Sequence, residues 1–148
     1  MFNRKRNQMP GIYYLFNRQE DSNMKRDNII FWVSTIIIFL FQGVMPALTS
    51  HTEMAKEGIR HLGYPEYFGV MLMVFKVLGS IAIIIPGVPN RVKEWAYAGQ
   101  AFDIIAAFIS IWAVDGFNVN LFIPAIVMAI LIVSYIYFHK SVKSKMTI

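Results

Sequence analysis

The chain contains no cysteine among its 148 residues. This absence excludes disulfide bonds, thiolate catalysis and covalent haem attachment through thioethers. Electron transfer by this chain would therefore need a bound carrier, such as a quinone, because no dithiol is present. The sequence also lacks a glycine-rich phosphate-binding loop, a nucleophile elbow and a carboxylate pair placed for catalysis. Its motifs thus give no support to a hydrolase or a nucleotide-dependent enzyme.

Charged residues are also scarce in this sequence. Only 16% of the residues are charged and 56% are hydrophobic, with a mean hydropathy of +0.47. Soluble domains carry roughly 25% charged residues, and a bilayer-spanning helix needs about 20 mainly apolar residues. Four segments meet that length, residues 29–49, 67–86, 95–114 and 119–138. They predict an all-α membrane protein, a four-helix up-down bundle whose transmembrane domain covers residues 29–138 in the lipid bilayer.

The basic residues are unevenly distributed around these spans. Eleven of the 14 Lys and Arg residues lie in the tail 1–28, the loop 87–94 and the tail 139–148, which share one side of the bundle. The opposite side carries only Lys56 and Arg60. Basic residues concentrate on the cytoplasmic side of membrane proteins, so we expect both termini in the cytoplasm. The net charge of +5 then reflects membrane topology and does not indicate a nucleic-acid partner.

The N-terminal tail 1–28 admits two interpretations. Its basic residues, which include Arg4, Lys5 and Arg6, suit a basic foot on the anionic headgroups of the cytoplasmic leaflet. Alternatively the tail is a loosely ordered extension. It lacks the continuous apolar core of a signal peptide, so we expect it to stay on the protein.

A short helix outside the membrane is predicted between the first two spans. Ser50 and Glu53 match the capping box, in which both side chains satisfy the first free backbone amides of a helix. Residues 54–62 follow as the expected helix, and Gly63 and Pro65 end it. We expect this helix to lie over the extracytoplasmic mouth of the bundle.

The same loop contains three residues that metal sites often use, His51, Glu53 and His61. Their spacing is not an established metal-ligand pattern, and no cysteine supports it. We therefore expect no metal site here and interpret the segment as a solvated helix at the membrane surface.

Lys76 and Asp103 each lie near the centre of an apolar span. A charge at the middle of a spanning helix costs about 2.5–3.5 kcal/mol on insertion scales, so it usually faces the protein interior with a partner. From the helix rise, Lys76 lies about 14 Å and Asp103 about 17 Å below the outer boundary. The two antiparallel spans therefore bring the two charges to similar depths. We expect an intramembrane ion pair.

Further polar residues gather in the outer half of the bundle. The candidate ligand-binding residues are Gln42, His51, Glu53, His61 and Gln100. One hypothesis is a small pocket that binds a polar or quinone-like head group, with Lys76 or Asp103 relaying protons. The alternative is an ion pair that only fixes helix pairing and register.

Several short motifs occur in order between residues 49 and 110. They are Gly-Ile-Arg-His-Leu-Gly-Tyr-Pro-Glu-Tyr-Phe (58–68), Lys76 with Gly79, Ile-Pro-Gly (85–87) and Lys-Glu-Trp-Ala-Tyr-Ala-Gly (93–99) followed by Phe102 and Asp103. Together with the four-span pattern, this set resembles the DoxX-like family of bacterial membrane proteins. The basic N-terminal tail lies outside the resemblance.

The resemblance implies a multi-pass protein of the bacterial inner (plasma) membrane. The family name comes from a membrane subunit linked to thiosulfate oxidation with quinone reduction, and some relatives carry an oxidoreductase label. It therefore implies a membrane component of a quinone-linked redox or stress-response system, working with a redox partner subunit or as a homo-oligomer. A small proton-coupled transporter or permeation unit and a non-catalytic scaffold subunit stay open as alternatives. The residues themselves do not identify an enzymatic activity.

Overall fold

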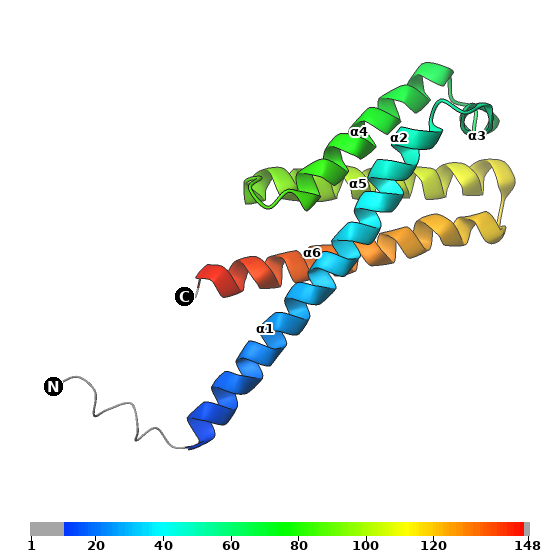
Figure 1. Cartoon of the computed structure of the whole chain (residues 1–148). Coiled ribbons are helices and arrows are strands. Elements are labelled where there is room, and N and C mark those ends of the chain that lie inside the picture. Colours follow the sequence, from blue (N-terminus) through cyan, green and yellow to red (C-terminus); the bar gives the residue numbers. More distant parts are fainter. Residues whose placement is uncertain (1–10, 147–148) are drawn as a thin grey trace.

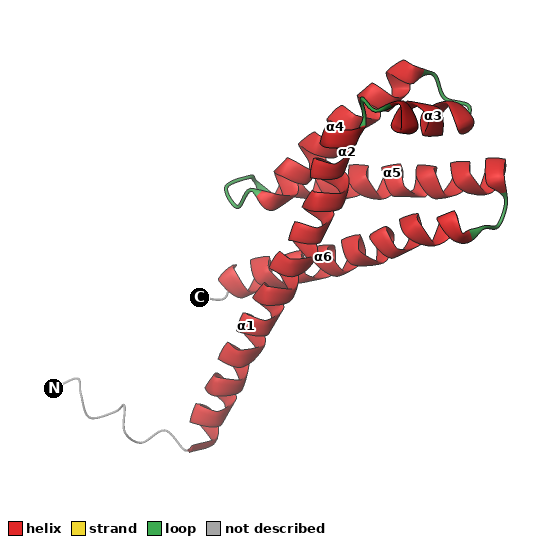
Figure 2. Ribbon diagram, turned by 45° about the vertical axis from the view of Figure 1, so that its right-hand side comes forward, coloured by secondary structure: helices red, strands yellow, loops and turns green. Residues whose placement is uncertain are grey.

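The computed structural model describes residues 11–146, which form helices and no strand (Figures 1 and 2). The elements are α1 (Gly11–Ile38), the π-helix η1 (Phe39–Val44), α2 (Met45–Thr49), α3 (Glu53–His61), α4 (Glu66–Ile84), α5 (Asn90–Asp115), the 3-10 turn η2 (Val119–Leu121) and α6 (Phe122–Met146). Four helical stretches are long and apolar enough to cross a membrane, Arg18–Thr49, Glu66–Ile84, Asn90–Asp115 and Val119–Lys143. The predicted all-α membrane fold is confirmed.

The spans run alternately up and down. The continuous rod of α1, η1 and α2 leads to α3, α4 returns beside η1, and α5 and α6 follow as an antiparallel pair. Figure 1 shows α1 crossing α6 obliquely, with its first turns extending beyond the other helices. One end of the bundle holds α3 and the turn between α5 and α6, and we call it the α3 end. The other, the terminus end, holds the turn between α4 and α5 and the end of α6.

The first span begins earlier than the sequence pattern indicates. α1 starts at Gly11 and passes residue 29 without a break, so residues 11–28 are helical and continue into the first span. Arg4, Lys5 and Arg6 lie outside the described residues.

The packing is that of a protein in lipid. Large apolar side chains point outward, among them Trp95 at 82% and Phe102 at 73% exposure. The core between α1, α4, α5 and α6 mixes apolar residues with small hydroxyl residues, Ser34, Thr35, Ser80 and Ser134. Small residues let membrane helices approach closely, and hydrogen bonds between them add stability because lipid offers no alternative partner.

The short helix between the first two spans is present as α3, one residue displaced from the prediction. Its capping residue is Thr52, whose hydroxyl accepts a hydrogen bond from the Ala55 amide at 3.3 Å. The predicted capping box with Ser50 is wrong. Ser50 has helical backbone angles at the end of α2, whereas an N-cap needs the extended backbone that Thr52 adopts.

Candidate functional site

Lys76 and Asp103 face each other from α4 and α5. The Lys76 Nζ lies 3.2 Å from the Asp103 Oδ2, so the two side chains form an ion pair. The two side chains keep 24% and 14% of their surface accessible. The pair therefore lies at the edge of the helix interface and is not sealed inside it.

Gln42 approaches the same carboxylate from the first span. Its Nε2 donates to the Asp103 Oδ2 at 3.4 Å, and the residue is itself buried. Gln42 belongs to η1, and single π-helical turns inside α-helices are frequent at functional sites. Next to it, Gly43 allows close packing, since a Cβ there would lie 3.0 Å from the Ser80 Cβ of α4. The π-helix is thus held against the helix that carries Lys76.

Gln100 lies one turn before Asp103 on α5 and is 2% exposed. Its Nε2 donates to the backbone carbonyl of Lys76 at 2.9 Å and contacts the Ser80 Oγ at 3.4 Å. The amide therefore joins α5 to the turn of α4 that presents the lysine.

Two hollows flank Lys76. The first, of about 420 Å³, lies at the α3 end between α2, α3 and α4, and includes His51, Lys56 and Glu66. The second, of about 580 Å³, is a groove between α4 and α5 that we call the α4–α5 groove. Asp103 and Gln100 line only the groove, and Leu72 and Lys76 line both hollows. The sequence led us to expect a single pocket, whereas the structure has two hollows, and Lys76 lies between them.

The walls of the α4–α5 groove are apolar apart from these polar groups. Its aromatic side chains are Phe75, Trp95 and Phe102, and all three are largely exposed on the surface that lipid would cover. A ligand from the membrane could therefore enter it sideways, with an apolar body along the groove and a polar head at Lys76 and Asp103.

The model of the DoxX-like family matches residues 30–134. The chain belongs to the DoxX-like family. The matched range contains the second and third spans in full, part of the first and fourth, and every residue of the two hollows described above. No curated protein matches the chain, and no solved structure does.

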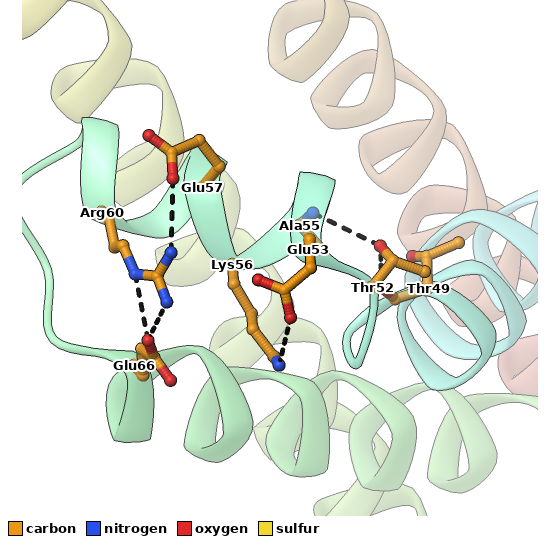
Figure 3. A network of polar contacts seen from close by, with 8 residues as sticks. All are labelled: Thr49, Thr52, Glu53, Ala55, Lys56, Glu57, Arg60 and Glu66. Atoms are coloured by element: carbon orange, nitrogen blue, oxygen red, sulfur yellow. Dashed lines mark hydrogen bonds and ion pairs between the residues drawn. The ribbon is translucent and has the colours of Figure 1, made fainter.

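The predicted loop residues of this DoxX-like protein are dispersed. Glu53 pairs with Lys56 at 2.8 Å, a contact that lowers the pKa of the glutamate and raises that of the lysine (Figure 3). His61 lies 2.5 Å from Asp115 at the end of α5. Neither Glu53 nor His61 lines either hollow, and only His51 does. Within residues 11–146, no three His, Asp or Glu side chains gather to hold a metal ion.

An ion-pair cluster holds α3 against α4. Arg60 of α3 binds Glu66 at the start of α4 and also Glu57, and these contacts raise the pKa of its guanidinium (Figure 3). Ile59 packs over Gly69, where a Cβ would come within 3.1 Å of it. The cluster positions α3 as the roof of the hollow at the α3 end.

Two polar contacts of the DoxX-like bundle were not foreseen from the sequence. Lys93, which sequence analysis counts only as a loop charge, is 5% exposed and donates from Nζ to the Ile83 carbonyl at 2.9 Å. It thereby neutralises the C-terminal end of α4. Ser134 contacts the Tyr97 hydroxyl at 2.7 Å and the Thr35 hydroxyl at 2.9 Å. Hydroxyl residues on three different spans were the only sequence signal for this second contact.

Proposed function

We propose that this DoxX-like protein binds a small lipid-soluble molecule with a polar, quinone-like head group in the α4–α5 groove. It would serve as a membrane component of a quinone-linked redox or stress-response system. Lys76 and Asp103 exchange a proton with the head group, and Gln42 orients the carboxylate. The observation that carries the proposal is the ion pair itself, because its two charges line a groove that faces the lipid.

The position of the pair favours a binding role over a purely structural one. A pair that only fixes helix register does not need to be reachable from outside the helix interface, whereas this pair keeps part of each side chain accessible and lines the groove. Ionisable residues inside membranes are rare and usually mark ligand or proton pathways. The groove volume also falls within the usual range of ligand pockets, about 300–1,000 Å³.

The cellular setting follows from the charge distribution. We infer a bacterial inner membrane with both termini in the cytoplasm, so that the α3 end faces outward. Since the chain has no cysteine, a quinone bound in the groove would supply the redox chemistry, and a partner subunit would supply the other electron-transfer group.

The test is a thermal-shift measurement on the purified protein with short-chain quinone analogues. A ligand at 100 times its Kd stabilises the folded state by about 2.7 kcal/mol, which raises the melting temperature by several degrees. We expect this shift in the wild type and in Ser134→Ala, whose side chain lies outside the groove. Asp103→Asn should lose it. If no analogue shifts the wild type, the binding proposal is wrong.

A second function is favoured by one observation: Lys76 lines both hollows. A residue at such a junction could pass protons between the α3 end and the groove, as a small proton-coupled permeation unit does. Reconstituted protein would then acidify liposomes under a membrane potential, and Asp103→Asn would stop it. Quinone binding without proton flux would reject this alternative.

Exchanging the two charges separates both functions from a scaffold. The double variant Lys76→Asp/Asp103→Lys keeps an ion pair between α4 and α5. A scaffold would retain its fold and its assembly partners, whereas a binding site would lose its ligand because the head group meets the charges in reversed positions.

A further inference from the structure

The amide of Gln100 has a fixed orientation. Its Nε2 points at the Lys76 carbonyl oxygen, which also accepts from the Ser80 hydroxyl at 2.7 Å. Turning the amide over would place Oε1 against that carbonyl oxygen, and two acceptors repel. The amide nitrogen therefore faces α4.

This orientation leaves the amide oxygen alone. Gln100 Oε1 is buried, and it is the one side-chain polar atom of the described residues that is enclosed without a hydrogen-bond partner. Native proteins leave few such groups unpaired, because each one loses its hydrogen bonds to water and gains none. A hydrogen-bond donor on a ligand bound beside Gln100 would therefore gain this oxygen as a partner.

The fold makes specific room for this amide. At Gly79, which also lines the α4–α5 groove, a Cβ would lie 2.7 Å from Gln100 Nε2. Gly99 lines the same groove, yet a Cβ there would meet nothing within 4 Å. Only the first glycine is needed for the amide to lie where it does.

The polar groups of the groove offer acceptors beside the ammonium group of Lys76. Lys76 Nζ already contacts the Asp103 Oδ2, and Gln42 contacts the same oxygen, while the Asp103 Oδ1 takes part in neither contact. The Gln100 Oε1 adds a neutral acceptor. Gln100 itself lines the groove, and the soft terminal torsion of glutamine allows a small tilt that keeps Nε2 at the Lys76 carbonyl while a ligand in the groove reaches Oε1.

We propose that the groove selects ligands whose head group carries a hydroxyl, such as a hydroquinone, and that Gln100 is the residue that selects them. The hydroxyl donates to Gln100 Oε1, whereas a head group with acceptors only leaves this oxygen unpaired. The inference rests on the proposed function and adds to it the chemical form of the ligand that binds more tightly.

The experiment measures affinity and needs no turnover. Full-length protein in lipid nanodiscs is titrated calorimetrically with 2-decylhydroquinone and with its dimethyl ether, which has the same body and no hydroxyl. Empty nanodiscs correct for partitioning. We expect the hydroquinone to bind about tenfold more tightly, the usual effect of one hydrogen bond to a buried group.

Two pairs of variants locate the effect. Gln100→Leu removes the acceptor at similar size and should bring the ratio of the two affinities close to one, while Ser134→Ala should keep it. Gly79→Ala displaces the amide and should lower the ratio even if Gln100→Leu does not fold. Gly99→Ala adds the same methyl group to the groove and should leave the ratio unchanged.

The outcomes separate the two proposals. Equal affinities in the wild type, or an unchanged ratio in both Gln100→Leu and Gly79→Ala, would overturn the selection by Gln100 and leave the binding proposal standing. Absence of binding by both probes, together with no thermal shift by any quinone analogue, would overturn the proposed function and this inference with it.

Discussion

Removing one charge of the Lys76–Asp103 pair should cost more stability than removing both. Asp103→Leu leaves an ammonium group facing an apolar groove, and breaking a buried pair in this way costs about 3–5 kcal/mol. Because the side chains keep 24% and 14% of their surface accessible, we expect the lower end, about 3 kcal/mol. The double variant Lys76→Met/Asp103→Leu has no unpaired charge and should unfold close to the wild-type temperature.

The assay is thermal unfolding in mild detergent, followed by circular dichroism and by size-exclusion chromatography. For a chain of this size, about 3 kcal/mol corresponds to a fall in melting temperature of roughly 6–12 °C. The single variants Asp103→Leu and Lys76→Met and the double variant form a thermodynamic cycle that isolates the coupling between the charges. Equal melting temperatures for Asp103→Leu and the wild type would refute the reasoning, as would additive losses in the double variant.

Three further stability predictions concern contacts away from the groove, each checked by the same unfolding assay. Lys93→Met should destabilise the protein by about 1–3 kcal/mol, because the Ile83 carbonyl loses its buried donor; an unchanged melting temperature would contradict this. Ser134→Ala should cost about 1–2 kcal/mol by leaving two hydroxyl groups unpaired, and a neutral effect would show that they find other partners. Gly43→Ala should loosen η1 from α4, whereas Gly58→Ala, with nothing within 4 Å, should be neutral or stabilising; the reverse order would reject the close-packing argument.

The four spans were predictable because hydropathy and length depend on composition alone. Their ends were not, since local backbone geometry decides them. α4 stops at Ile84 although the apolar run continues, because Ile85 precedes Pro86 and adopts an extended backbone. Similarly, Ser50 and Thr52 are both residue types that cap helices well. Thr52 caps α3 because Ser50 lies at the end of α2 and therefore has a helical backbone.

Part of the candidate site was also predictable. Lys76, Asp103 and Gln100 are rare polar residues in apolar spans, and helix rise alone placed the two charges at similar depths. The division into two hollows depends on how each helix is rotated about its axis, which an average period of 3.6 residues does not fix. His61 and Glu53 were assigned to the pocket because they lie in the right loop, yet their contacts with Asp115 and Lys56 hold them elsewhere.

The wider turns of η1 have a consequence for how one span serves two neighbours. Thr35 and Gln42 are seven residues apart, so a regular α-helix would direct them the same way to within ~20°. Here Thr35 reaches a hydroxyl on α6 while Gln42 reaches the carboxylate on α5. The π-helix thus changes the direction in which the side chains of the first span point. Deleting a single residue between positions 39 and 44 would change the rotation of the helix at Gln42 and direct this side chain away from Asp103.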